Sequence, residues 1–252
     1  MALAILLCSA EVKAAPSVAH FQARVHDVLV DVVQIDLTDP EIVVRPLVLP
    51  DDGRKRASLW DFVRHHQPLA AINGTFFDTR TWRVTGNVVV DGVLVREGYV
   101  GNAIAFDRQN RPTIIHNTGR MGRHTDWSRF PAAMGGGPLL LIDGKLSVNP
   151  WAEGFRDPGL FRLTRRSAVG YNSNQKLLLV SARSMVNFHG LARIMQALGA
   201  TNAISLDGGS SSALYYRGRV LAAPMRKLTN MLAIFEKATR PVRPELGANG
   251  GF

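Results

Sequence analysis

The sequence predicts a single domain of the α+β class, with a mixed β-sheet, several hairpins and a few short helices. Its 23 glycines and 13 prolines indicate many turns, and therefore many short strands. Two short helical segments each lead into a short apolar strand that ends in Asn-Gly or Asp-Gly. No low-complexity stretch divides the 252 residues. We expect the domain to cover residues 15–237.

The first half of the chain is expected to supply strands around one helix. Strand-like apolar runs cover residues 25–37 and 42–49. Ser58 then has the position of a helix N-cap, with Asp61 three residues later and an apolar helical face. A buried strand over residues 69–72 follows this helix and leads into Asn73-Gly74.

The second half repeats the helix–strand plan among hairpins. Apolar residues at helical spacing predict a helix around residues 191–198, and the next strand leads into Asp207-Gly208. If this strand and strand 69–72 run the same way in one sheet, Asn73 and Asp207 open onto the same edge. Further hairpins and strands are predicted over residues 88–95, 139–144, 167–180, 215–221 and 231–235. Asp91 and Asp143 are the turn residues of two of these segments.

The charge balance favours an anionic partner. The formal net charge is +10, and arginine, whose fixed fork of donors matches phosphate and carboxylate, far outnumbers lysine. The basic residues are scattered, without a basic run interleaved with aromatics, so no nucleic-acid partner is expected. The sequence predicts no particular oligomeric state.

The two ends of the chain predict export and a loose tail. Residues 1–14 form a short apolar segment ending in small residues, which predicts a signal peptide and a periplasmic or secreted protein. No transmembrane segment is expected. Cys8, the only cysteine, lies in this leader, which leaves the mature chain without a disulfide or a zinc–thiolate site. Residues 238–252 are rich in Pro, Gly and charge and predict disorder.

The segment 202–212 carries the clearest chemical signal. A mostly apolar strand ends at Asp207, and two glycines and three serines follow it. A carboxylate at a strand end, beside exposed N–H groups and hydroxyls, can hold or attack an oxygen-rich ligand. A tight turn is the simpler interpretation, because Asp-Gly is a common turn pair. Similarly, Gly135-Gly136-Gly137 indicates a close approach of the backbone, either to another chain segment or to a ligand.

Four segments in order resemble the phosphodiester glycosidase family, which has bacterial exopolysaccharide-associated members. They are residues 71–78 around Asn73-Gly74, 135–141 with the triple glycine, 166–170 beginning at Arg166, and 202–212 around Asp207. The resemblance spans roughly residues 69–235. It implies a mixed domain that cleaves the bond between a sugar's anomeric carbon and a phosphate oxygen.

The resemblance also implies a set of site residues. Asp207, Arg166 and Asp78 are the expected catalytic residues: Asp207 faces the anomeric centre as nucleophile, base or electrostatic stabiliser, Arg166 grips phosphate with two donors, and Asp78 is the other carboxylate in a matching loop. The expected substrate-binding residues are Asn73, Gly74, Gly136, Asn202, Gly208, Gly209, Ser210, Ser211 and Asn230. No cofactor and no metal ligand are predicted, and dependence on a divalent metal stays open.

Three residues depart from the family pattern, and two other functions stay open. Thr75 and Ser210 stand where glycine is usual, and Ser181 precedes Ala182-Arg183 where many members have Asp-Gly-Arg. The same pocket could bind an anionic cell-wall polymer or exopolysaccharide without turnover. The protein could also break the P–O bond as a phosphodiesterase, although no dense set of His and Asp ligands for two metals is visible.

Overall fold

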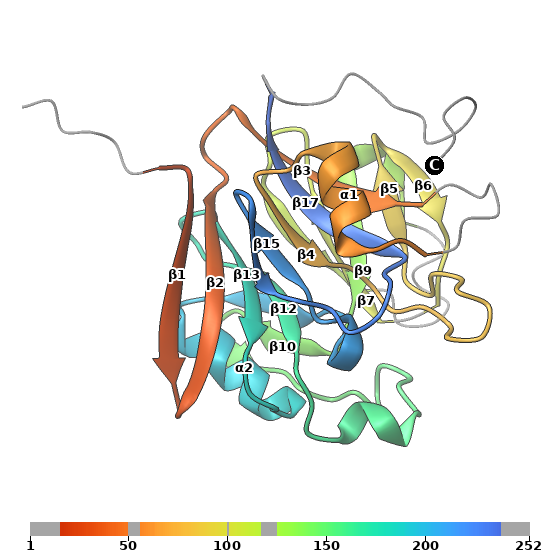
Figure 1. Cartoon of the computed structure of the whole chain (residues 1–252), viewed down its shortest axis with the longest axis vertical. Helices are drawn as coiled ribbons and strands as arrows, with labels where there is room; N and C mark the ends of the chain where they lie inside the picture. Colours follow the sequence, from red (N-terminus) through yellow and green to blue (C-terminus); the bar gives the residue numbers. More distant parts are fainter. Residues whose placement is uncertain (1–15, 50–55, 100, 117–124, 238–252) are drawn as a thin grey trace, which may run out of the picture.

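The computed structural model describes residues 16–49, 56–99, 101–116 and 125–237, and it is built mainly from strands (Figure 1). Three sheets share one core, and the two α-helices of the described residues pack on outer faces. The predicted combination of sheets and short helices is confirmed, but the sheets are antiparallel rather than mixed. Short turns join many neighbouring strands, and such connections permit only antiparallel pairing. The predicted leader and tail lie outside the described residues.

The largest sheet has seven strands and carries the helix α2 (Phe188–Ala197). Asn187 caps α2 by accepting the Gly190 N–H at 2.8 Å, so the helix begins three residues before its predicted start. Leu191 and Met195 bury completely against the sheet. In spatial order the strands are β1 (Val18–Val25), β2 (Val28–Asp36), β13 (Lys176–Ala182), β12 (Ser167–Tyr171), β14 (Asn202–Ser205), β10 (Leu139–Ile142) and β11 (Lys145–Leu146).

The second sheet has five strands and is covered by the helix α1 (Leu59–His66). The predicted N-cap is confirmed as a capping box: Ser58 Oγ accepts the Asp61 N–H at 3.1 Å, and the Asp61 carboxylate accepts the Ser58 N–H at 2.8 Å. In spatial order the strands are β16 (Arg219–Ala222), β15 (Leu214–Tyr216), β4 (Ala70–Asn73), β17 (Asn230–Glu236) and β3 (Ile42–Val48).

The third sheet also has five strands and contributes residues to the shared core. Its strands, in spatial order, are β6 (Val93–Arg96), β5 (Val88–Val90), β9 (Ala132–Gly136), β7 (Asn102–Phe106) and β8 (Pro112–Ile115). Asp91 and Asp143 sit in their hairpin turns at φ of 52° and 48°, as predicted for turn residues. Short 3-10 turns complete the described elements: η2 (Trp127–Arg129), η3 (Pro158–Phe161) and η4 (Gly209–Ser211).

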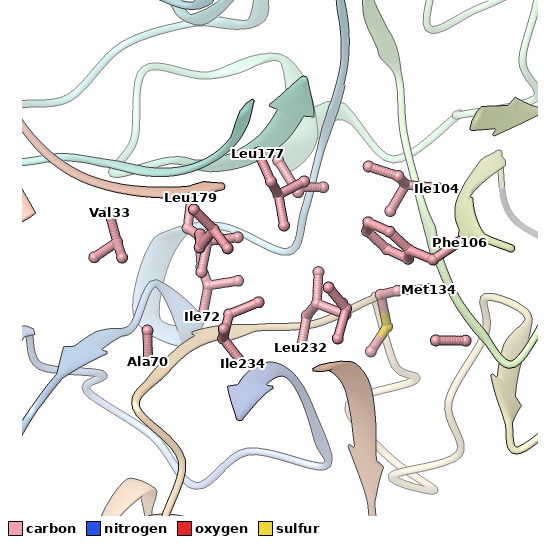
Figure 2. Packing of buried hydrophobic residues seen from close by; sticks show 14 of the residues in the cluster. Val33, Ala70, Ile72, Ile104, Phe106, Met134, Leu177, Leu179, Leu232 and Ile234 are labelled. Atoms are coloured by element: carbon pink, nitrogen blue, oxygen red, sulfur yellow. The ribbon is translucent and has the colours of Figure 1, made fainter. Parts of the chain in front are cut away.

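The main core lies where the three sheets face one another (Figure 2). Leu179 comes from the seven-stranded sheet, Ile72 and Ile234 from the second sheet, and Ile104 and Met134 from the third, and all five are fully buried. Burial of such side chains stabilises the fold by about 1.5–3 kcal/mol each. This shared core fixes the strand ends of all three sheets relative to one another.

One predicted relation between strands is wrong, although the residues it concerned do meet. β4 pairs with β15 and β17, whereas β14 pairs with β10 and β12, so the two strands belong to different sheets. Periodicity along the chain cannot reveal this, because it says nothing about pairing partners. Asn73 at the end of β4 nevertheless donates from Nδ2 to the Asp207 carbonyl oxygen at 2.7 Å.

Candidate active site

Residues 73 and 74, at the end of β4, hydrogen-bond to both the backbone N–H and the backbone carbonyl of Asp207. Its N–H donates to the Gly74 carbonyl at 3.1 Å, and its carbonyl accepts Asn73 Nδ2. The Asn73 Oδ1 atom accepts the Ala213 N–H at 2.9 Å. The Asn73 amide thus hydrogen-bonds to the backbone before and after the glycine–serine loop and positions Asp207; a substrate contact of Asn73 stays a prediction.

The Asp207 carboxylate sits in a desolvated but accessible position. Oδ1 accepts the Gly208 N–H at 2.8 Å, and the side chain is only partly covered. Burial raises the pKa of Asp207 to about 6, against the opposing effects of the Ser211 hydroxyl, the Gly208 N–H and the charge of Arg226. Asp207 is therefore largely ionised at pH 7, as a nucleophile, a base or an electrostatic stabiliser must be.

Gly74 and Asn230 form a second clamp under the same loop. Asn230 Oδ1 accepts the Thr75 N–H at 2.7 Å, and its Nδ2 donates to the Thr75 carbonyl at 3.2 Å. A Cβ on Gly74 would lie 1.9 Å from Asn230 Oδ1, so only glycine fits there. Both residues were predicted to bind substrate, which stays a prediction; the hydrogen bonds described for them are to the backbone and, from Asn230 Nδ2, to Thr229 Oγ1 at 2.8 Å.

In the turn after Asp207, the N–H groups that were predicted to bind an anion donate to oxygens of the protein. Gly208 donates to Asp207, and Gly209, at a φ of 62°, donates to the Arg165 carbonyl at 2.7 Å. Ser210 Oγ accepts Nε of Arg226. Ser211 Oγ is buried and makes no aligned hydrogen bond, although it is close enough to Asp207 to lower that pKa.

Arg166 is buried and is held by backbone carbonyls instead of by a carboxylate. Nε donates to Val186 O at 2.9 Å, and Nη2 donates to Leu160 O at 2.6 Å and to Arg162 O at 2.9 Å. The guanidinium lies 3.7 Å from the Phe188 ring centroid, and burial lowers the pKa of Arg166 to about 10. Its Nε–Nη2 edge is therefore not available for the two-pronged phosphate grip that the sequence suggested, and Nη1 is the nitrogen left for a ligand.

The triple glycine lies against neighbouring chain segments. A Cβ on Gly136 would come within 2.7 Å of Ser205 O, and one on Gly135 within 2.8 Å of Asn87 N. Of the two interpretations of this motif, the close approach of another segment is the one observed. Gly136 thereby packs the third sheet directly against β14, which ends two residues before Asp207.

Two other predicted site residues are Asn202, which lies apart from the Asp207 loop, and Asp78, whose carboxylate binds its own turn. Asn202 starts β14, at the opposite end from Asp207, about 16 Å away along an extended chain. Its Oδ1 accepts the Asp143 N–H at 3.2 Å. Asp78 caps its own turn, where Oδ1 accepts the N–H groups of Arg80 and Thr81 at 2.8 Å each. These backbone hydrogen bonds lower the pKa of Asp78; a catalytic role for it stays a prediction.

Sequence reasoning missed two charged groups, Arg226 at the Asp207 loop and Glu153 beside Gly137. Arg226 contacts Ser210 and acts on the charge of Asp207. Glu153 sits beside the Gly137–Pro138 cis peptide, where it accepts the Leu139 N–H at 2.9 Å and Asn102 Nδ2 at 2.7 Å, and burial raises its pKa to about 7. Neither residue stands in a recognisable motif, so only the fold could reveal them.

The departure at Ser181 has a structural counterpart on the neighbouring strand. Ser181 pairs with Asp31 in the register of β13 and β2. The buried Asp31 carboxylate accepts Nε of Arg183 at 2.6 Å and Nη2 at 3.1 Å. A carboxylate therefore lies beside Arg183 even though position 181 is a serine.

The described residues offer neither a ready metal site nor a membrane-spanning helix. No group of three or more His, Cys, Asp or Glu side chains within them is placed to hold a metal ion. None of the helices in the described ranges is long and apolar enough to cross a bilayer.

A family model for phosphodiester glycosidases matches residues 66–235, which is more than half of the chain. The chain belongs to the phosphodiester glycosidase family. The matched region contains Asn73, Arg166, Asp207 and Arg226, and it covers all of the contacts around Asp207 described above.

Curated relatives and solved structures agree with this membership at low identity. The chain is 25% identical over 226 residues to N-acetylglucosamine-1-phosphodiester alpha-N-acetylglucosaminidase of Mus musculus and 23% identical over 227 residues to that of Bos taurus. The match covers 78% of this chain and 43% of the mouse enzyme, and 79% of this chain and 42% of the cattle enzyme. The chain therefore spans less than half of the length of these relatives.

The fold also occurs in solved structures. The zebrafish catalytic domain of the same enzyme, auto-inhibited by its pro-peptide, matches at a TM-score of 0.71 and 21% identity, covering 88% of this chain and 84% of that one. A hypothetical protein from Synechocystis matches at a TM-score of 0.73 and 19% identity, covering 88% of this chain and 64% of that one.

Proposed function

We propose that this protein is an exported hydrolase that cleaves the bond between the anomeric carbon of a sugar and a phosphodiester oxygen, with Asp207 acting at the anomeric carbon. The observation that carries the proposal is the Asp207 carboxylate itself. It stands at a strand end, is fixed on both sides of its backbone by Asn73 and Gly74, and has a pKa raised to about 6 by burial. Membership of the phosphodiester glycosidase family supports the reaction class.

The chemistry needs little beyond what this site holds. A phosphate monoester is a good leaving group, so strong general-acid assistance is less necessary than for an ordinary glycoside. The developing positive charge at the anomeric carbon requires a nearby carboxylate, and the departing phosphate requires positive charge. Asp207 supplies the first. Arg166 contributes a buried cation whose described contacts include no carboxylate, with Nη1 as its remaining donor.

N-acetylglucosamine 1-phosphodiesters are the substrates to try first, because the mouse and cattle relatives are named for them. Export to the periplasm or the exterior is part of the proposal and comes from the apolar segment 1–14. The intact mass of protein recovered from its native compartment tests it. A full-length cytoplasmic species would end the export proposal.

Hydrolysis in ¹⁸O-labelled water tests which bond breaks. Label on the anomeric oxygen of the released sugar is the expected result, and label on phosphate would mean P–O cleavage. Asp207→Asn changes few atoms and should lower turnover by several orders of magnitude while ligand binding persists. If wild type binds anionic glycans but turns over none of a panel of sugar 1-phosphodiesters, the protein is a binding protein and the proposal is wrong.

A further inference from the structure

Arg226 is anchored to the Asp207 loop by contacts of different kinds. Its Nε donates to Ser210 Oγ, three residues after Asp207. Its guanidinium lies over the Phe77 ring, with Cζ 5.5 Å from the ring centroid. The N–H of the preceding residue, Met225, donates to the Ser210 carbonyl at 2.7 Å. These contacts hold the Arg226 side chain against the loop.

The terminal nitrogens of Arg226 remain available to a ligand. The side chain is exposed, and within the described residues its one hydrogen bond is the Nε contact to Ser210. Other arginines around the loop are occupied differently: Arg165 Nη2 donates to Ala223 O at 2.9 Å, and Arg166 donates to three carbonyls. The Nη1–Nη2 edge of a guanidinium matches two oxygens of a phosphate group.

The change of charge during the reaction indicates what this cation would do. When the C1–O bond breaks, its electron pair stays on the phosphate oxygen. The diester monoanion becomes a monoester dianion, while water supplies the hydroxyl group at C1 and releases one proton. A cation on the phosphate side interacts more strongly with the dianion than with the diester, so it stabilises the transition state more than the bound substrate.

We propose that Arg226 binds the leaving phosphate of the substrate, with Ser210 and Phe77 fixing its guanidinium beside Asp207. The inference rests on the proposed function and names the group that recognises the phosphate. The same positive charge favours the ionised form of Asp207, so one side chain serves both halves of the reaction.

Arg226→Gln tests the assignment, with Lys227→Gln as the matched control because Lys227 is exposed, adjacent and loses the same charge. On the methyl phosphodiester of N-acetylglucosamine 1-phosphate, Arg226→Gln should lower kcat by about 100- to 1,000-fold, and Lys227→Gln by less than about twofold. Inhibition by methyl phosphate should weaken at least about tenfold in Arg226→Gln, while inhibition by free N-acetylglucosamine stays unchanged.

The outcomes separate this inference from the proposed function. If wild type releases sugar and Arg226→Gln does so equally well, the assignment of Arg226 is overturned and the function stands. If the variant loses turnover but methyl phosphate inhibits it as it inhibits wild type, Arg226 does not bind phosphate and the assignment also fails. If wild type turns over no diester, methyl phosphate binding to wild type and Arg226→Gln is compared by calorimetry; equal affinities overturn the inference, and loss in the variant supports it.

Discussion

Replacing Asp207 with asparagine should make the fold more stable at neutral pH, because burial disfavours the ionised carboxylate of this candidate catalytic residue. Burial raises the pKa of Asp207 from 3.8 to about 6. The folded state then binds the proton more tightly than the unfolded state does. Stability is lost as pH rises from about 4 through 6, and the ionised group costs about 3 kcal/mol above that range.

Asparagine keeps the oxygen that accepts the Gly208 N–H but carries no titrating charge. We expect the difference in unfolding free energy, Asp207→Asn minus wild type, to grow by about 2–3 kcal/mol between pH 4 and pH 8. Urea unfolding at five pH values measures it, with an unchanged m-value showing that the unfolded states are comparable.

Asp78→Asn is the control with the opposite sign. Backbone hydrogen bonds lower the pKa of Asp78, so the ionised carboxylate stabilises the fold, and this variant should lose stability relative to wild type as pH rises. If the Asp207→Asn difference stays flat across this range, the carboxylate is well solvated and the physical basis for its role is wrong.

Three further predictions concern the charged groups around the site. kcat/KM for a sugar 1-phosphodiester should fall below about pH 6 as Asp207 takes up a proton, which a pH–rate profile measures; a profile flat to pH 5 would contradict the role of that carboxylate. Arg166→Lys should cost about 1–3 kcal/mol in a urea titration and most of the turnover, because lysine cannot donate to the same three carbonyls; wild-type activity would remove Arg166 from the site. Burial raises the pKa of Glu153 from 4.5 to about 7, so Glu153→Gln should gain stability over wild type as pH rises from about 5 to 8. Thermal melts measure this difference, and a difference that does not change with pH would show Glu153 to be solvated.

Local chemistry made the helices and hairpins predictable. The capping box at Ser58 and Asp61 and the left-handed turns at Asp91 and Asp143 depend on residues within four positions of one another, so the sequence contains the whole interaction. β1 (Val18–Val25), β7 (Asn102–Phe106) and β9 (Ala132–Gly136) were not predicted. β7 and β9 pair with each other across the intervening residues 107–131, and a periodic pattern cannot name such a partner; β1 pairs with the adjacent β2.

The candidate site was predictable only in part, for the same reason. Asp207 stands in a strand–glycine–serine pattern that is visible locally, and it lies two residues beyond the end of β14. Arg226 lies in a loop without a pattern and reaches Ser210 from 16 residues away. Conversely, Asn202 shares the motif of Asp207, but the motif extends over a whole strand and so places the two residues at opposite ends.

Asn73 shows why the Asn-Gly pair at the end of β4 is more than a turn signal. Because β4 and β14 belong to different sheets, no β-ladder joins their ends, and the backbone hydrogen bond from Asp207 N–H to Gly74 O links the residues just beyond them. The side chain at position 73 adds two more hydrogen bonds: it donates to Asp207 O and accepts from Ala213 N. An ionised aspartate has no donor and leucine has neither group, so an amide is required at this length. The backbone position of the catalytic candidate is thus set by a buried side chain from another sheet.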